Sequence, residues 1–391
     1  MIRPIILYHS LNKVLLLAVG IWPYHQSKFT QFQFVFFSAT LSASIIVQLI
    51  LLIKFKCTSD LIVKVMSSVS FFIILIIKYI LFHFNLEAVK NLFTNLQHVL
   101  NDLKNENEIA ILEKYNFIAK CYTIVLTALG VGVLSSFIIA QFWSDISNII
   151  VSVNTSQSRY ILISSEYFID QEKYFYWIVL HISSTLCIGI IIMVGIGTIL
   201  VTYIQHTCGI FRIASYRIEH AVNINILQNT LKNKILMMES IIQAINIHRQ
   251  AIKLSKRLVS TFDIMFFCFT GCLIACLALN LFQLLQVVSS KNIIDLFLPF
   301  TYATTSFLYI FISNYIGQNI TDHNNHLFVT AYNIRWYKTP LHIQKIILFL
   351  LQNGTKKFTL KVGGMIDGSI ENFAMVIKTS ISYFTVMYST R

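Results

Sequence analysis

The sequence predicts an all-α membrane protein with seven transmembrane helices, and three observations support this fold class. Hydrophobic residues make up 56% of the 391 positions and charged residues only 12%, whereas a soluble domain carries about 25% charged residues. The apolar residues gather in runs of about 20, the length at which an α-helix crosses a hydrocarbon core roughly 30 Å thick. Lys and Arg residues fall mainly in alternate connections between these runs, as the positive-inside rule requires of a multi-pass protein.

Six runs are long and apolar enough to be transmembrane spans. They cover residues 32–53, 61–82, 117–142, 177–202, 262–288 and 296–317. A seventh run, 373–389, is shorter and more polar, and we predict that it also crosses the membrane. The apolar run 341–351 has about half the length that a span requires, so it predicts a buried or interfacial helix instead.

The distribution of Lys and Arg predicts the orientation of these spans. Of the 30 Lys and Arg residues, 20 lie in the N-terminal segment and in the connections after spans two, four and six. Because positively charged loops stay in the cytoplasm, the N-terminus is predicted to be cytoplasmic and the C-terminus extracellular. The sequon at Asn154 then lies in an outer loop, where it can be glycosylated.

The sequence contains little that indicates an enzyme, a metal site or a nucleic-acid interface. No nucleophile elbow, phosphate loop or carboxylate pair occurs, so we predict no catalysis and no cofactor. Cys268, Cys272 and Cys276 repeat every four residues beside small residues, a pattern more typical of close helix packing than of metal binding. The basic residues lie in loops without an interleaved aromatic motif, which argues against nucleic acid. The charged residues within spans are expected to reach a membrane face with their charged ends; they are Lys64, Lys78, Lys120 and Asp263.

The last predicted span has one side rich in hydroxyl groups. In a helix this side carries Thr379, Ser382, Tyr383, Val386, Ser389 and Thr390, and the other side carries Ile377, Ile381, Phe384 and Tyr388. A buried hydroxyl group without a partner costs about 1–3 kcal/mol, so a stripe of them indicates contact with water or with another polar helix. Two interpretations stay open at this point: hydrogen bonds between helices of one bundle, and the lining of a water-filled pore.

Three classes of non-enzymatic membrane protein fit a chain with seven spans. A G-protein-coupled receptor requires the opposite orientation, and its D-R-Y and N-P-x-x-Y motifs are absent. A secondary transporter usually shows two similar halves with interrupted spans, and the sequence shows no such repeat. A ligand-gated channel accounts best for the polar side of the last helix.

Four stretches resemble the insect odorant receptor family: GIWPYHQSKF, NYIGQNITDHNNHL, AYNIRWYKTP and the terminal KTSISYFTVMYSTR. The similarity extends over the whole chain, including its length and its number of spans. In the related gustatory receptors, a Thr-Tyr pair and five apolar residues usually precede Gln-Phe. Here Ser382 precedes Tyr383 and no Gln-Phe follows. The resemblance therefore favours the odorant branch; a gustatory-type receptor channel of the same superfamily and a G-protein-coupled receptor are the alternatives.

The resemblance implies a subunit of a non-selective cation channel that opens when it binds small, volatile, apolar molecules. In this family such a subunit joins a shared odorant co-receptor subunit in a heterotetramer, and each seventh span lines the pore. The implied location is the plasma membrane of olfactory sensory neurons. The short connection 203–261 indicates a tuning subunit and not the co-receptor.

The resemblance also implies four regions. Residues 1–31 form a cytoplasmic segment, 32–317 hold spans one to six with a pocket in their outer half, 318–372 form a cytoplasmic subunit-contact segment, and 373–391 form the pore-lining span. Helices that continue from spans four, five and six extend into the cytoplasm. When the last span is aligned with the family, Val386 and Thr390 fall at the constriction, where Val386 would form a hydrophobic gate.

Odorant recognition is implied in the outer halves of spans two, three, four and six. Ser136, Ile139 and Trp143 share one helical face, because they are spaced i, i+3 and i+7. The complete set combines aromatic rings with scattered hydroxyl groups and suits small volatile molecules. It consists of Ser67, Ser70, Phe71, Ser136, Ile139, Trp143, His181, Ser184, Thr185, Tyr302, Thr305 and Tyr309.

Overall fold

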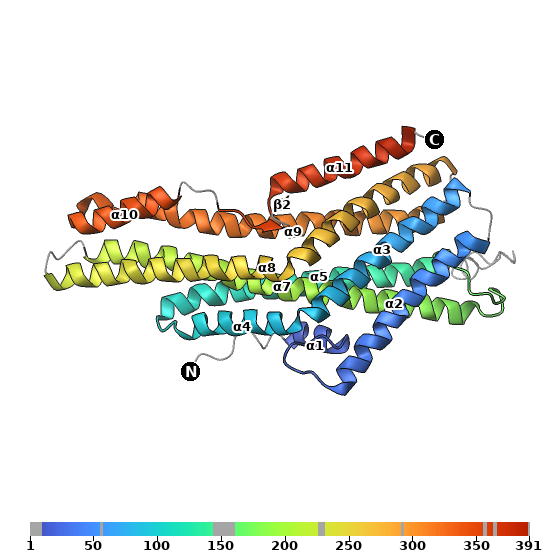
Figure 1. The fold of residues 1–391 in the computed structure, drawn as a ribbon, viewed down its shortest axis with the longest axis horizontal. Coiled ribbons are helices and arrows are strands. Elements are labelled where there is room, and N and C mark those ends of the chain that lie inside the picture. The colour runs from blue at the N-terminus through green and yellow to red at the C-terminus, as the bar shows by residue number, and fades with distance from the viewer. Residues whose placement is uncertain are drawn as a thin grey trace.

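The chain folds into a long bundle of helices, shown from the side in Figure 1. The structure, a computed structural model, describes residues 10–54, 58–143, 161–225, 231–290, 293–354, 358–362 and 366–389. The predicted all-α class is confirmed, because helices dominate these residues. The only strands within them are β1 (Lys361–Val362) and β2 (Ile366–Asp367), a short antiparallel pair in which Lys361 lies opposite Asp367.

Six helices among the described residues are long and apolar enough to cross a membrane, which makes the chain a multi-pass membrane protein. They are α2 (Lys28–Lys54), α3 (Ser59–Phe84), α5 (Glu106–Gln141), α7 (Phe175–Asn225), α8 (Leu231–Ser290) and α9 (Ile293–Asn333). These six helices contain the six clear spans predicted from hydropathy. The seventh predicted span lies in α11 (Ile370–Ser389), which does not belong to this set, so its crossing of the membrane stays a prediction.

Three of these helices are much longer than a membrane is thick. α7, α8 and α9 contain 51, 60 and 41 residues. At 1.5 Å per residue, α8 is roughly 90 Å long, about three times the hydrocarbon thickness. It bends at Phe262, whose φ of −110° and ψ of 15° are not helical, and the fifth predicted span begins at this residue. The added length supports the prediction that these helices continue into an aqueous compartment.

Four shorter elements pack around the long helices. They are α1 (Ser10–Ala18), α4 (Leu86–Asn101), the 3-10 helix η1 (Trp336–Lys338) and α10 (Leu341–Gly354). The helix predicted at 341–351 is present as α10. Hydropathy does not predict α1 and α4, because each is too short to be a span. α1 is nevertheless fixed to the bundle by Asn12, whose Nδ2 donates to Thr202 Oγ1 at 3.0 Å.

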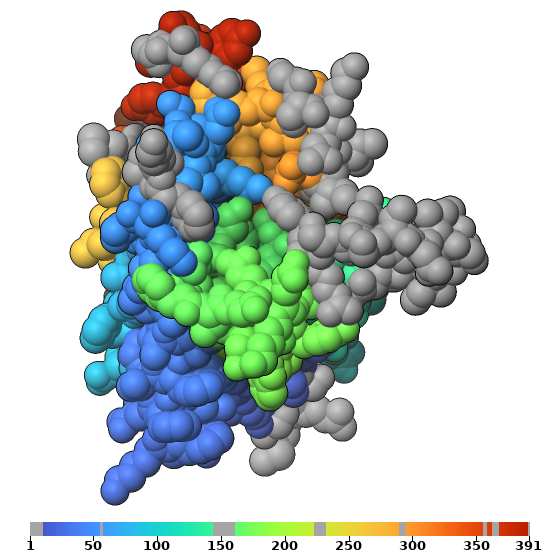
Figure 2. Space-filling model, turned by 90° about the vertical axis from the view of Figure 1, so that its right-hand side faces the viewer, coloured from blue at the N-terminus to red at the C-terminus, as the bar shows by residue number. Residues whose placement is uncertain are grey.

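Different helix ends lie at the two ends of the bundle. The C-terminal ends of α2, α8 and α11 lie together at the right of Figure 1, and α10, the C-terminal end of α7 and the N-terminal end of α8 lie at the left. Figure 2 views the right-hand end, where the segment leading into α7 (green) lies between α2 (blue) and the ends of α8 and α9 (orange). The charge distribution predicts that the right-hand end is extracellular, and this orientation stays a prediction.

A small apolar cluster positions α11 against the bundle. Ile74 of α3, Leu273 of α8, Ile310 of α9 and Val376 of α11 are all buried in it. Beyond this cluster, Asn372 Nδ2 donates to Asn314 Oδ1 at 2.9 Å. The last helix is therefore attached to α8 and α9 by its first turns, and the rest of it extends along the outside of the bundle (Figure 1).

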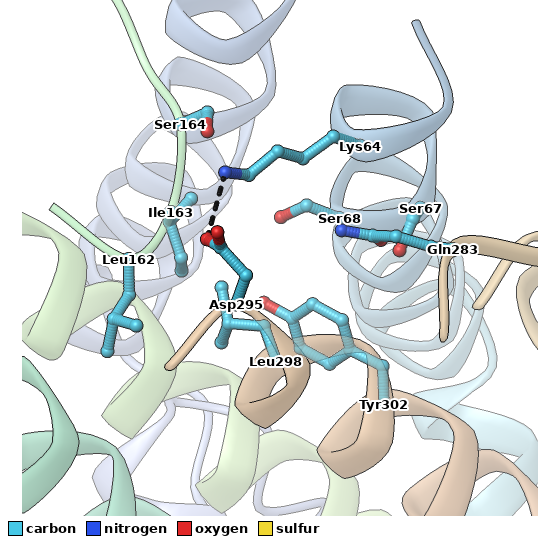
Figure 3. Close-up of a pocket in the computed structure, with 10 residues that line it drawn as sticks. All are labelled: Lys64, Ser67, Ser68, Leu162, Ile163, Ser164, Gln283, Asp295, Leu298 and Tyr302. Carbon is cyan, nitrogen blue, oxygen red and sulfur yellow. Dashed lines mark hydrogen bonds and ion pairs between the residues drawn. The ribbon is translucent and has the colours of Figure 1, made fainter. Parts of the chain in front are cut away.

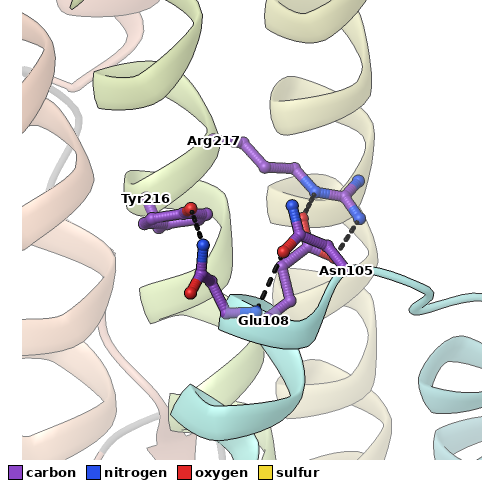
Figure 4. A network of polar contacts seen from close by, with 5 residues as sticks. Asn105, Glu108, Tyr216 and Arg217 are labelled. Atoms are coloured by element: carbon purple, nitrogen blue, oxygen red, sulfur yellow. Dashed lines mark hydrogen bonds and ion pairs between the residues drawn. The ribbon is translucent and has the colours of Figure 1, made fainter.

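A bidentate ion pair joins α5 to α7 at the left-hand end. Arg217 donates to Glu108 through Nε at 2.6 Å and through Nη2 at 2.9 Å, as Figure 4 shows. Beside it, Asn105 caps α5 by accepting from the Asn107 backbone N–H, and the Asn107 side chain donates to Tyr216. The Glu108 side chain is only 5% exposed, so the ion pair is largely shielded from water.

Candidate functional site

A pocket opens at the right-hand end of the bundle, between α3, α8, α9 and the segment 161–164 (Figure 3). Its empty space is about 330 Å³, open mouth included. Six of the ten lining residues are polar or charged, three are aliphatic, and Tyr302 combines a ring with a hydroxyl group. The lining consists of Lys64, Ser67, Ser68, Leu162, Ile163, Ser164, Gln283, Asp295, Leu298 and Tyr302.

An ion pair crosses one side of the pocket. Lys64 Nζ of α3 lies 3.4 Å from Asp295 Oδ1, and the two side chains are 31% and 24% exposed. Asp295 lies in the first turn of α9, where the helix dipole favours a negative charge. The pair therefore connects α3 to the start of α9 and leaves the pocket close to neutral overall.

Two buried hydroxyl groups face the pocket and have no hydrogen-bond partner among the described residues other than each other. They belong to Ser68 and Tyr302, which are 6% and 4% exposed. The neighbouring Ser67 differs, because its hydroxyl donates to Asn280 Oδ1 of α8 at 2.6 Å. Behind the pocket, the ring of Phe71 stacks on Tyr302 with centroids 4.6 Å apart, which fixes the direction of the Tyr302 hydroxyl.

The segment that precedes α7 lies over the pocket and is held at two points. The Leu162 backbone N–H donates to Gln141 Oε1 at 3.2 Å. Lys54 Nζ forms an ion pair with Glu166 at 2.8 Å, and the Glu166 backbone N–H donates to Val47 O at 3.0 Å. The hydrogen bond from Lys54 is the main reason that the pKa of Glu166 lies below its usual value. These contacts place Leu162 and Ile163 as one wall.

The structure brings part of the predicted ligand set together. Ser67 and Tyr302 line the pocket and Phe71 lies behind Tyr302. The rest do not line it. Ile139 of α5 and Trp143, which follows the end of α5 at Gln141, are 53% and 51% exposed and lie on the outside of the chain. The remaining members bond within their own helices or to other neighbours; they are Ser70, Ser136, His181, Ser184, Thr185, Thr305 and Tyr309.

The expectation that Lys78 extends to a membrane face is wrong. Its side chain is 1% exposed and lies inside the bundle. The ammonium group donates to Met193 O at 3.1 Å and to the Tyr309 hydroxyl, and it lies 5.5 Å from the centroid of the Phe269 ring. Hydrogen bonds and cation–π contacts from three helices thus replace the water that a snorkelling lysine would reach.

Sequence reasoning missed several residues of the pocket. Lys64 and Asp295 are charges close to span ends, and this was a usable signal, but their pairing joins residues far apart in the sequence. Ser68 is adjacent to Ser67 and was not singled out. Leu162, Ile163 and Ser164 lie in a connection, where hydropathy gives no indication of contact with the spans.

The predicted pore-lining side of α11 is largely uncovered in the single chain. Tyr383 and Val386 are 58% and 56% exposed, Ser382 and Ser389 are also exposed, Thr379 is half-buried, and Thr390 lies outside the described residues. The buried side differs from the expected one. Asn372, Val376 and Ser380 are buried, Ile377 and Phe384 are half-buried, and the expected Ile381 and Tyr388 are exposed.

Among the described residues, no group of three or more His, Cys, Asp or Glu side chains is placed to hold a metal ion. The described residues do contain a partly open pocket with two buried hydroxyl groups and a terminal helix with an uncovered polar side. Together with six membrane-length helices, these features define the class as a multi-pass helical membrane protein with a pocket between its helices.

The family model described as 7tm Odorant receptor matches residues 58–381. The chain belongs to this odorant receptor family, whose members are receptors and channels and not enzymes. No curated protein sequence matches the chain.

Two solved structures share the fold. The insect olfactory receptor OR5 from Machilis hrabei matches with a TM-score of 0.74 and 13% identity, over 98% of this chain and 98% of that chain. The same receptor in complex with eugenol matches with a TM-score of 0.72 and 14% identity, over 98% of this chain and 97% of that chain. At this level of identity the likeness shows the fold alone.

Proposed function

We propose that this chain is the tuning subunit of an odorant-gated, non-selective cation channel. The family supports a receptor-channel subunit, and one observation carries the finer assignment: α9 connects the pocket to the last helix. Asp295 and Tyr302 of α9 line the pocket, and about three turns after Tyr302, Asn314 accepts a hydrogen bond from Asn372 of α11. A ligand that displaces α9 thus acts directly on α11.

The pocket supports the binding of a small molecule. It is a partly open space between helices in which hydroxyl groups, an ion pair and aliphatic side chains meet, and ligand pockets typically combine apolar walls with a few placed polar groups. Burial of about 300 Å² of ligand surface, at roughly 25 cal/mol per Å², contributes about 7 kcal/mol before the costs of association. Affinity is therefore expected to be modest. The similar OR5 was solved in complex with eugenol, which supports a small organic ligand here.

The remaining predicted ligand contacts stay part of the proposal. Ser136 and Ile139 lie on α5, Trp143 follows the end of that helix, and His181 and Thr185 lie on α7. We propose that these residues extend the recognition region beyond the pocket in Figure 3.

The exposed side of α11 supports its role as the pore-lining helix. Ser382 and Ser389 are exposed in the single chain. The Ser389 hydroxyl donates to Val386 O at 3.0 Å, whereas the Ser382 hydroxyl would be satisfied by water in a pore and not by lipid. Val386 lies between them, and a ring of such residues from several subunits would stop ions by dewetting. One helix cannot enclose a path, so the pore requires assembly.

The left-hand end of the bundle supports assembly with other subunits. Large apolar side chains are exposed there on α9, η1 and α10, which lie within the predicted contact segment 318–372. Val329, Tyr332, Tyr337, Leu341 and Phe349 are 57%, 68%, 62%, 67% and 66% exposed. Exposed apolar groups of this kind mark protein interfaces. We propose that they contact neighbouring subunits of a heterotetramer that includes the odorant co-receptor.

The proposed location is the plasma membrane of olfactory sensory neurons, with the N-terminus in the cytoplasm. The proposed glycosylation site Asn154 and the first nine residues lie outside the described residues. The membrane, the odorant and the conducted cations are then the other partners of the chain.

Expression with and without the odorant co-receptor, in cells that contain neither, tests this proposal. Alone, the chain is expected to give no odorant-evoked current, whereas with the co-receptor a panel of volatile compounds should evoke a cation current. The control is the co-receptor alone with its own agonist. A full-sized odorant current without the co-receptor would contradict the tuning-subunit assignment, and the absence of any odorant current from the pair would contradict the channel function.

A further inference from the structure

We infer that the pocket recognises a neutral, largely apolar molecule through one hydrogen-bond acceptor oxygen, such as the carbonyl oxygen of a ketone or an ester. The inference rests on the proposed function and names the ligand class of the same site. It depends on the buried hydroxyl groups of Ser68 and Tyr302, which lie on α3 and α9 and face one space (Figure 3).

Apart from each other, the two hydroxyl groups have no hydrogen-bond partner in the described part of the chain. Their residues are 6% and 4% exposed, and a pair of hydroxyl groups that bond only to each other still has a hydrogen to donate. Buried hydroxyl groups are normally satisfied, as Ser67 is by Asn280. Water can serve in the empty pocket, but a ligand that displaces this water must replace its hydrogen bonds or lose affinity.

The chemistry of the walls indicates which ligand can do this. A carbonyl oxygen has two lone pairs, so it can accept from one or both hydroxyl groups. A hydrocarbon of the same shape would cover both hydroxyl groups and bond to neither. Lys64 and Asp295 pair with each other beside this space, so a charged ligand would have to compete with one of them for the other. The site therefore favours a neutral oxygenated compound.

The rest of the pocket accommodates an apolar body. Leu162, Ile163 and Leu298 form its apolar walls, and the Phe71 ring stacked on Tyr302 holds the phenol in place. A phenol held in this way is pre-organised to donate, which reduces the entropy lost when the ligand binds.

Matched pairs of ligands test the inference on the chain co-expressed with the co-receptor. Methyl ketones from 2-hexanone to 2-decanone, and acetophenone, are each compared with the alkene in which a CH₂ group replaces the carbonyl oxygen. The members of a pair have nearly the same shape, so a difference in potency reports the oxygen. The most potent ketone is expected to exceed its alkene about tenfold or more.

Two substitutions test whether the preference for the ketone over its alkene depends on the hydroxyl groups of Tyr302 and Ser68. Tyr302→Phe removes the hydroxyl and keeps the ring that stacks on Phe71, and Ser68→Ala removes the second hydroxyl. In the double variant the ketone and its alkene are expected to be equipotent within about twofold. The control Thr270→Val removes a hydroxyl that donates within α8 to Phe266 O, roughly 20 Å along the helix from Gln283, and should keep the tenfold preference. A co-receptor agonist reports whether each variant assembles.

Equal potency of ketones and alkenes on the unsubstituted chain would overturn the inference and leave the proposed function intact. So would a response confined to hydrocarbons, or a ketone preference that survives in the double variant while that variant still assembles. If the unsubstituted pair gives current with the co-receptor agonist but with no volatile compound, the proposed function fails, and the inference fails with it.

Discussion

Replacement of Arg217 by alanine is expected to destabilise the protein by about 3–5 kcal/mol, because it leaves the Glu108 carboxylate buried without its partner. The Glu108 side chain is 5% exposed and accepts two hydrogen bonds from Arg217, at 2.6 and 2.9 Å. The midpoint of thermal unfolding of detergent-solubilised protein should fall by roughly 4–6 °C.

Two further variants show whether the destabilisation by Arg217→Ala comes from the unpaired, buried charge of Glu108 or from the loss of any arginine side chain. Arg249→Ala removes an exposed arginine from α8 and is expected to stay within about 0.5 kcal/mol of the unsubstituted chain. The double variant Glu108→Leu with Arg217→Met removes both charges, and apolar replacement of a buried pair is often close to neutral. If Arg217→Ala unfolds at the same temperature as the unsubstituted chain, the pair does not stabilise the α5–α7 contact.

Replacement of Gly317 by alanine is expected to disrupt the connection between α9 and α11. A Cβ atom at Gly317 would lie 2.7 Å from the carbonyl oxygen of Gly368 and 2.9 Å from its Cα. These are backbone atoms, which cannot rotate away, so the segment that leads into α11 must move. Overpacking of this kind costs about 1–3 kcal/mol, and the neighbouring hydrogen bond between Asn314 and Asn372 (2.9 Å) would be strained or lost.

We expect Gly317→Ala to reduce the maximal odorant-evoked current about tenfold or more at unchanged surface expression, since a shift of this bond is worth about 1–3 kcal/mol in the gating equilibrium. Gly271→Ala is the matched control, because a Cβ at this α8 glycine meets nothing within 4 Å. The measurement is the maximal odorant-evoked current of each variant, divided by its surface labelling. A normal current from Gly317→Ala would mean that α9 does not control α11 through this contact.

The membrane explains why the sequence predicts the spans well. A helix must be apolar over about 20 residues to cross lipid, so the six clear spans are visible as runs, and the six membrane-length helices contain them. The lengths of α7, α8 and α9 could not be obtained in this way, because their distal halves are partly polar and pack on other helices. α1 and α4 are short and amphipathic, and only tertiary packing fixes them.

Only some of the predicted ligand contacts line the pocket, because that prediction used depth in the membrane. Depth places Ser67 and Tyr302 near the same end of the bundle, but it does not specify which helices are neighbours. The arrangement of neighbouring helices determines that Lys64 pairs with Asp295 and that Lys78 is buried against Met193. Likewise, helical periodicity divided α11 into two sides, whereas contact with α8 and α9 determines that Val376 and Ser380 are the buried residues.

The central proposal is that odorant binding opens a pore lined by α11, and one measurement tests it most directly. Cysteine is introduced singly at Ser382, Val386 and Ser389, and as controls at the buried Val376 and Ser380. A charged, water-soluble thiol reagent is applied from outside to cells that express each variant with the co-receptor, during an odorant-evoked current. The unsubstituted chain with the same reagent sets the baseline for its native cysteines.

The proposal predicts irreversible block at residues 382, 386 and 389, faster when the odorant is present, and no block at the two buried positions. This pattern requires an odorant-opened, water-filled path along the exposed side of α11. Block at none of these positions, or block without regard to the side of the helix, would contradict the proposal; the hydroxyl groups of α11 would then serve contacts between helices, and the pore would be lined elsewhere.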